Sequence, residues 1–141
     1  MTTQAQIETV TRHYLLALLW TAPENDACEN PGDTYDVSDL PQSVYDEARQ
    51  DCEAFILTCG PLFDAVMACY ADGYGQHPDA GSAEAAFGHD FALTRNHHGV
   101  GFWDREHEGL PKDLGDKLTR LAQSMGTRNL LIEPDGSIYY G

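Results

Sequence analysis

Apolar residues recur at three- and four-residue intervals in four segments of the chain, which is the spacing of helices that bury one face. The four predicted helices cover residues 4–20, 38–59, 62–71 and 110–126. Residues that commonly cap helices stand at their ends: Thr2 or Thr3 before the first, Ser38 or Asp39 at the start of the second, and Gly126 at the end of the last. We therefore expect most of the N-terminal half to be helical.

Two polar stretches separate these predicted helices. Residues 21–38 hold two prolines, one glycine and five acidic residues without periodicity, and they predict a loop. Residues 72–88 are polar and rich in glycine, and they predict a second connection with at most one helical turn over 83–87. The helical part of the chain is therefore expected to span residues 1–75.

From Asp90 onward the apolar residues alternate with polar ones, which is the period of a half-buried strand. A β-hairpin with His97 and His98 as its loop residues places four apolar side chains on one face: Phe91, Leu93, Val100 and Phe102. In this register Asp90 lies opposite Arg105, which predicts a cross-strand ion pair at the rim of a sheet.

A second hairpin is predicted at the C-terminus, where residues 129–133 and 137–140 flank the turn sequence Pro134-Asp135-Gly136. The whole pattern predicts an α+β fold, in which N-terminal helices precede a ββαββ unit over residues 88–141 that forms an antiparallel sheet. The chain has 141 residues, of which 42% are hydrophobic, so we expect a single domain with its own core.

The charge of the chain restricts its partners. Eight Lys and Arg residues against 23 Asp and Glu residues give a net charge of −15, and residues 24–53 alone hold ten acids and one base. A field of this sign repels nucleic acid and anionic membranes and attracts basic protein surfaces. Direct binding of DNA or RNA is therefore disfavoured. Acidity that serves only to keep the protein soluble is the open alternative.

The second predicted helix carries an acidic ridge opposite its apolar face, formed by Asp46, Glu47, Asp51 and Glu53. We expect the ridge to contact a partner protein with a basic surface. The face of the first hairpin that carries Trp103 and Arg105 is the second expected contact surface, because its glycines leave a flat platform beside the aromatic ring.

The cysteines and the N-terminus indicate the compartment. The four cysteines form no CxxC pair, and Cys52 and Cys59 fall on the apolar face of a predicted helix, so we expect buried free thiols. The N-terminus lacks a basic segment, and its apolar run over residues 14–20 is too short to span a bilayer. The sequence therefore predicts a reduced, soluble and cytoplasmic protein.

The stretch GHDFALTRNHHGVGFWDREHE, residues 88–108, concentrates groups capable of chemistry. Acid–base catalysis by His89, Asp90, His98 and Asp104 is the alternative to a plain hairpin. The spacing HxxxH is absent, as are GxSxG, a P-loop and GxGxxG, so we expect no metal ion and no cofactor. Arg95 and Asp104 fall on the apolar face of the predicted hairpin, where charged side chains need partners.

The same stretch resembles the signature GHDFxLTRNxHGxGFWDR of a group of small uncharacterised proteins encoded by bacteriophages and prophages. The likeness extends through DCEAFI (residues 51–56), LGDKLT (114–119) and DGSIYY (135–140). The chain differs from many members at Ala92, where they carry a bulky aromatic residue, and at His97, where they carry glycine. The resemblance implies a phage or mobile-element accessory protein and brings no established activity.

Charge and resemblance together favour a small acidic protein that binds and inhibits a host nucleic-acid-handling factor. An anti-CRISPR or anti-restriction protein acting by DNA mimicry belongs to this class. The second hypothesis is a small metal-dependent hydrolase that uses polar residues of the motif: His89, Asp90, Arg95, Asn96, His98 and Asp104. The third is a structural phage module whose motif encodes only a hairpin.

Overall fold

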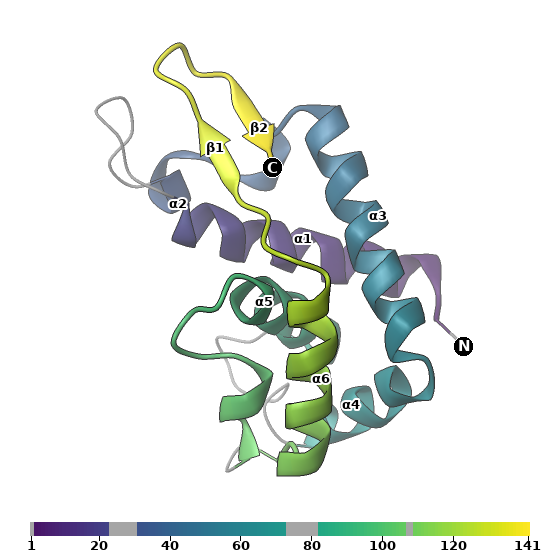
Figure 1. Cartoon of the computed structure of the whole chain (residues 1–141). Helices are drawn as coiled ribbons and strands as arrows, with labels where there is room; N and C mark the ends of the chain where they lie inside the picture. Colours follow the sequence, from purple (N-terminus) through teal and green to yellow (C-terminus); the bar gives the residue numbers. More distant parts are fainter. Residues whose placement is uncertain (1, 23–30, 73–81, 107–108) are drawn as a thin grey trace.

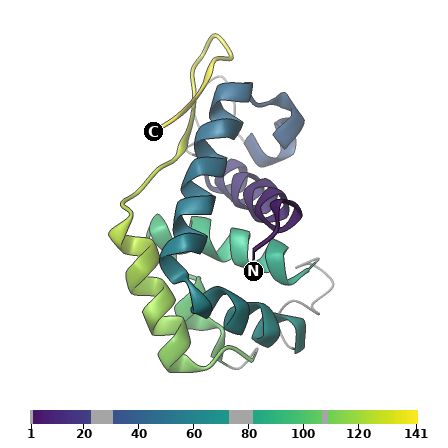
Figure 2. The same cartoon turned by 90° about the vertical axis from the view of Figure 1, so that its right-hand side faces the viewer.

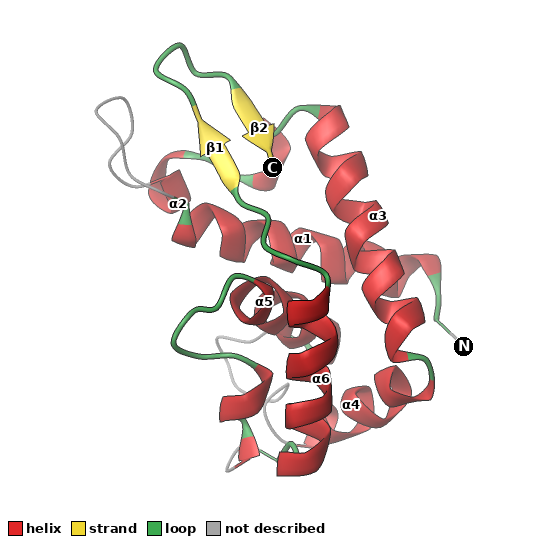
Figure 3. Ribbon diagram, viewed as in Figure 1, coloured by secondary structure: helices red, strands yellow, loops and turns green. Residues whose placement is uncertain are grey.

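Helices make up most of the chain, and a short hairpin closes it (Figures 1 and 3). The computed structural model describes residues 2–22, 31–72, 82–106 and 109–141. The α-helices of this part are α1 (Gln4–Thr21), α2 (Pro31–Thr34), α3 (Gln42–Cys59), α4 (Pro61–Asp72), α5 (Ala83–Arg95) and α6 (Lys112–Ser124). Two 3₁₀ helices, η1 (Val37–Asp39) and η3 (Phe102–Asp104), and two strands, β1 (Leu130–Ile132) and β2 (Ile138–Tyr140), complete it.

The four helices predicted from amphipathic spacing are confirmed as α1, α3, α4 and α6, and the C-terminal hairpin is confirmed as β1 and β2. Thr3 caps α1 in a reciprocal arrangement: its hydroxyl accepts from the Gln6 amide at 3.1 Å, and the Gln6 side chain accepts from the Thr3 amide at 2.9 Å. Gly126 follows α6 with a φ of 77°, the left-handed conformation expected of a C-terminal cap.

The predicted start of the second helix is wrong. Ser38 and Asp39 belong to η1, and α3 begins at Gln42 without a side-chain cap. Leu40 is extended, because the ring of the following Pro41 disfavours helical backbone at the preceding residue. The predicted loop over 21–38 contains α2 and η1, while its residues 23–30 lie outside the described part of the chain.

The predicted first hairpin is also wrong, and with it the α+β fold class and the ββαββ unit over residues 88–141. Residues 83–95 form one helix, α5, and the residues after it form a loop that ends in η3. Ser82 starts the helix by accepting a hydrogen bond of 3.1 Å from the amide of Ala85. The sheet in the described chain consists only of β1 and β2, in antiparallel register with Leu131 opposite Tyr139.

Alternating polarity was misleading in α5 because this helix is buried on almost all sides. Asp90, Thr94 and Arg95 are as buried as the phenylalanines of the same helix. A helix with no solvent-facing side shows no amphipathic period, so a short run of alternating residues resembled a strand. The residues that could have exposed the error are Phe87 and Phe91, which lie four positions apart as on one helical face.

α5 lies directly against α1, and Figure 2 shows the same close approach from the side. Gly88 makes this contact possible: a Cβ atom there would lie 2.2 Å from the carbonyl oxygen of Val10. Gly115 of α6 has a similar role against η3, since a Cβ atom at this position would lie 2.6 Å from the Phe102 carbonyl oxygen. Two glycines therefore set the distances between α5, α6 and their neighbours.

Aromatic rings fill the space between α1, α3, α5 and η3. Phe55 stacks on Phe91 with ring centroids 4.1 Å apart, and Phe87 and Phe102 lie 5.4 Å apart beside them. Tyr14 adds a ring from α1, with its centroid 5.0 Å from that of Phe91. The prediction of buried free thiols is confirmed for Cys52 and Cys59 in the same core, and burial raises the pKa of Cys59 to about 12.

α3 and α4 meet at a sharp corner. Gly60 stands between them with a φ of 56°, and the two helices are bent by 99° relative to each other. No single helix of the described residues is both long and apolar enough to cross a membrane; α3 and α4 meet those criteria only when taken together across this bend.

Candidate functional site

The motif residues from Gly88 to Arg105 are divided between α5, the turn after it, and the loop that leads into η3. The buried charges among them form two separate polar clusters. Both clusters join elements that are distant in the sequence, and together they hold Asp90, Arg95 and Arg105 of the motif.

The first cluster surrounds Asp90. Arg105 donates to both carboxylate oxygens, from Nη2 to Oδ1 at 2.8 Å and from Nε to Oδ2 at 3.1 Å. The hydroxyl of Tyr70 donates to Oδ2 at 2.6 Å. The predicted pairing of Asp90 with Arg105 is confirmed, but it is buried between a helix and a loop and does not lie at the rim of a sheet. This carboxylate is therefore a structural anion with its oxygens occupied.

The second cluster surrounds Arg95, which is only 1% exposed. Its Nη1 donates to Asp51 Oδ2 at 2.9 Å, its Nε to the carbonyl of Gly126 at 2.8 Å, and its Nη2 to the carbonyl of Met125 at 3.0 Å. A buried guanidinium is stable only when its charge and its N–H groups have partners. The partners that we expected a charged residue at position 95 to need are therefore Asp51 on α3 and the backbone carbonyls that follow α6.

Two tyrosines extend this cluster to the C-terminal strand. Arg95 Nη1 donates to the Tyr14 hydroxyl at 3.0 Å, the two tyrosine hydroxyls lie 2.6 Å apart, and Tyr140 donates to Asp51 at 2.6 Å. Burial raises the pKa of both tyrosines above the ordinary value of 10.0, so both hydroxyls remain protonated. A directed chain of donors therefore runs from Arg95 through Tyr14 and Tyr140 to Asp51.

Arg128 covers this cluster from the solvent side. Its guanidinium carbon lies 3.9 Å from the centroid of the Tyr140 ring, and its Nη1 lies 3.4 Å from Asp51 Oδ2. Its Nη2 lies 3.9 Å from Glu47. Asn96 holds the same segment by donating to the Arg128 carbonyl at 2.8 Å and accepting from the Arg128 amide at 3.0 Å. The loop after α6 is thereby attached to the end of α5.

The residues of the alternative catalytic hypothesis do not converge. Asp90 is held by the first cluster, His89 lies within α5, and His98 lies beyond the C-terminal end of that helix. The Nε2 atom of His98 is buried without a hydrogen-bond partner among the described residues. Asp104 is half-buried in η3. The described part of the chain brings together no three His, Cys, Asp or Glu residues in an arrangement able to hold a metal ion.

The predicted partner-binding residues have different surroundings. Asp46 and Glu47 are exposed on α3, Glu53 is half-buried there, and Trp103 is 43% exposed on η3. Asp51 and Arg105 are instead engaged in the two buried clusters. The acidic ridge is therefore narrower than the sequence indicated, since one of its four carboxylates faces inward. Contact with a partner remains a prediction for the exposed members.

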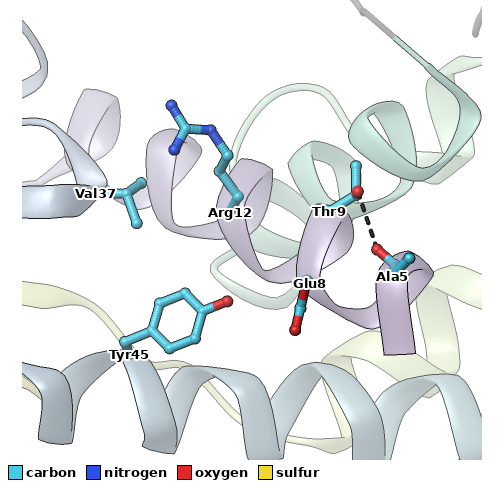
Figure 4. Close-up of a pocket in the computed structure, with 6 residues that line it drawn as sticks. All are labelled: Ala5, Glu8, Thr9, Arg12, Val37 and Tyr45. Atoms are coloured by element: carbon cyan, nitrogen blue, oxygen red, sulfur yellow. Dashed lines mark hydrogen bonds between the residues drawn. The ribbon is translucent and has the colours of Figure 1, made fainter. Parts of the chain in front are cut away.

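A groove opens beside this ridge, between α1, η1 and the N-terminal half of α3 (Figure 4). It consists of two adjoining hollows of about 320 and about 280 Å³, which share Arg12, Val37 and Tyr45. Glu8 extends from α1 toward α3, and Tyr45 extends from α3 toward α1. Burial and the Glu8 carboxylate raise the pKa of Tyr45. Sequence reasoning missed this groove because three separate segments build its walls.

Charge is distributed unevenly over the chain. Residues 1–94 hold sixteen acids and two bases, while residues 95–141 hold seven acids and six bases. Five of the eight bases form ion pairs with acids in the described part of the chain: Arg12, Arg95, Arg105, Lys112 and Arg128. Arg95 and Arg105 are buried and pair with Asp51 and Asp90, so they are not available to pair with acidic residues on the surface. Most of the surface carboxylates therefore have no matching cation in the described part of the chain.

Comparisons of the chain with protein-family models, with curated proteins and with solved structures find no match.

Proposed function

We propose that this protein is an interaction protein whose acidic α1–α3 surface, formed by Glu8 of α1 and by Asp46 and Glu47 of α3, binds a basic surface on a partner protein. The observation that supports this proposal most directly is that two of the eight basic residues of the protein are buried in ion pairs. Arg95 and Arg105 neutralise carboxylates inside the fold, so they do not reduce the negative field outside it. Such a field accelerates association with a basic partner and selects against acidic ones.

The groove between α1 and α3 gives this surface a shape as well as a charge. A Lys or Arg side chain entering at the Glu8 end would meet the Glu8 carboxylate on one wall and the Tyr45 ring on the other. The guanidinium of Arg12, which also lines the groove, is paired with Asp36 at 3.7 Å. A cation near both a carboxylate and an aromatic face is stabilised by charge pairing and by the ring quadrupole. Asp46, which follows Tyr45 on α3, extends the acidic surface beyond the groove.

The partner class that fits best is a host protein that handles nucleic acid. Such proteins carry Lys- and Arg-lined grooves that bind phosphates, and an acidic surface competes for the same groove. The resemblance of the chain to phage and prophage proteins supports the same partner class. An inhibitor of a CRISPR–Cas complex or of a restriction system that acts as a DNA mimic is the specific form of the proposal.

The test uses two variants with equal changes in charge. The Asp46→Lys/Glu47→Lys protein reverses exposed carboxylates of the proposed surface, and the Glu106→Lys/Glu133→Lys protein reverses two exposed carboxylates elsewhere. Each is immobilised and exposed to bacterial lysate, and bound proteins are identified by mass spectrometry and eluted with duplex DNA. The proposal expects a DNA-eluted protein on the wild-type and control resins and its loss from the Asp46/Glu47 variant.

Equal capture by all three proteins would contradict the proposal, because the acidic α3 surface would then be irrelevant. Equal loss from both variants would also contradict it, because net charge alone would then explain the capture. Circular dichroism and a thermal melt establish that each variant is folded before it is used.

A further inference from the structure

Lys117 and Arg120 are two cations that have no acidic partner in the described part of the chain. They lie three residues apart on α6 and are both exposed, so they project from the same face of the helix. Asp113 and Asp116 precede them by four residues on α6, but no ion pair joins these acids to Lys117 or Arg120 in the described part of the chain; Asp116 pairs with Lys112 instead. Both cations are therefore available to a carboxylate of another molecule.

The two cations border an apolar groove between α4 and α6. Leu62 at the start of α4 and Leu121 on α6 line it together with the two cations, and its volume is about 260 Å³. An occupant of this groove must therefore offer an apolar side chain with carboxylate close to it. A purely polar acidic segment would leave the leucines unused, and a purely apolar one would leave the cations unpaired.

A surface with this chemistry is present on the protein itself. Leu57 on α3 is 73% exposed, and Glu53 precedes it by four residues, so the two side chains are neighbours on the helix surface. Glu53 has no cationic partner among the described residues. The Leu57–Glu53 patch therefore matches the groove in both respects, apolar to apolar and anion to cation.

We infer that the protein forms a two-fold symmetric dimer in which the Leu57–Glu53 patch of each copy enters the α4–α6 groove of the other. The patch precedes the α3–α4 corner at Gly60, and Leu62 of the groove follows it. Leu57 and Leu62 are only five residues apart, so the two complementary surfaces are close enough to make reciprocal contacts across a two-fold axis.

The dimer is expected to be weak. Each half of the contact rests on one leucine and two cations, which is small compared with stable interfaces, and the like net charge of the copies opposes association. We therefore expect a dissociation constant on the order of 10–100 μM at moderate salt. Screening at physiological ionic strength limits the long-range repulsion to about 8 Å and leaves the local ion pairs to act.

Sedimentation equilibrium over increasing concentrations of the full chain measures this constant directly. Leu57→Ala is expected to weaken dimerisation about tenfold. Leu131→Ala, which truncates another exposed leucine on β1, is the matched control and should leave the constant unchanged. A wild-type chain that stays monomeric up to about 1 mM would overturn the proposal, as would a dimer that is indifferent to Leu57.

A charge exchange tests the pairing itself. The Lys117→Glu/Arg120→Glu protein and the Glu53→Lys protein should each be monomeric, because each carries like charges at both halves of its contact. Their equimolar mixture should dimerise, since every contact in the mixed pair is again between opposite charges. A mixture that stays monomeric would contradict the assigned partners. Neither protein alters Asp46 or Glu47, so failure here is distinguishable from failure of the proposed function.

Discussion

The guanidinium of Arg95 lies 2.9 Å from the carboxylate of Asp51, and this contact joins α5 to α3 where the C-terminal hairpin docks. Around it, Tyr14 of α1 and Tyr140 of β2 complete a hydrogen-bonded cluster that only the folded chain can assemble. The position of β2 therefore depends on a charged residue in the middle of the core. This relationship gives the first prediction.

Replacing Arg95 by alanine is expected to lower the free energy of unfolding by about 3–5 kcal/mol, because Asp51 would be left without its main cationic partner. The Arg95→Lys protein should lose less, since an ammonium keeps the charge but cannot donate to Asp51 and to both carbonyls of the α6 terminus at once. Urea denaturation followed by circular dichroism measures both values.

Arg49→Ala provides the control for the loss of an arginine, because Arg49 lies at the surface and its guanidinium donates to the Gln4 side chain. Its effect should remain within about 0.5 kcal/mol. Equal effects at Arg95 and Arg49 would show that the buried cluster does not stabilise the fold.

The close contact of α1 and α5 gives the second prediction. Gly88→Ala should destabilise the protein by about 3 kcal/mol or more, because the new methyl group would overlap the Val10 carbonyl and backbone cannot move aside as a side chain can. Gly99→Ala places its methyl in open space and should change stability by less than about 0.5 kcal/mol. Thermal melts that rank the two variants in the opposite order would be inconsistent with this packing.

The turn after α5 gives the third prediction. His97 has a φ of 59°, its amide donates to the Thr94 carbonyl, and the His98 amide donates to the Leu93 carbonyl, as in a Schellman motif with His97 in the left-handed position. Glycine relieves the strain of this conformation, so His97→Gly should stabilise the fold by about 1 kcal/mol.

Gly126 occupies the corresponding position after α6 with a φ of 77°, and nothing lies within 4 Å of its virtual Cβ atom. Gly126→Ala should therefore destabilise the fold by about 1 kcal/mol, for conformational reasons alone. Changes of the same sign in the two variants, measured as shifts in melting temperature, would argue against a left-handed residue at one of these caps.

Two half-buried histidines, His13 and His89, give the fourth prediction. Burial lowers the pKa of His89 below 6.5; Asp90 opposes this shift, and Arg105 adds to it. Burial, with help from Arg12 and His89, likewise lowers the pKa of His13. The unfolded chain therefore binds protons at these histidines more tightly than the folded chain does. Their contribution to the free energy of unfolding is fully present above pH 6.5 and is lost as the pH falls toward their pKa values in the folded protein.

His89→Gln should reduce this loss, because glutamine takes up no proton. The measurement is the free energy of unfolding at about pH 7.5 and about pH 5.5 for the wild-type and variant proteins. An identical decrease in both proteins would mean that His89 does not contribute to the acid sensitivity.

Local periodicity determined much of this fold. α1, α3, α4 and α6 each bury one face and expose another, so the three- and four-residue spacing of their apolar residues was sufficient to identify them as helices, although α3 begins four residues later than predicted. The turn residues Pro134, Asp135 and Gly136 and the strands on either side were likewise sufficient for the terminal hairpin. The acidity of residues 1–94 and the exposure of Asp46 and Glu47 on α3 could also be predicted from the local sequence.

Tertiary structure decided the rest, and α5 shows why. A central helix has no face in water, so its sequence lacks the period that identifies a helix, and its polar residues resembled candidates for catalysis. Asp90 and Arg95 are neutralised by Arg105 and Asp51, whose proximity no local pattern encodes. The sequence by itself determined which segments are amphipathic and the net charge of −15. Only packing decided which charges are inside, because burying a charge requires a partner that the fold must bring from elsewhere in the chain.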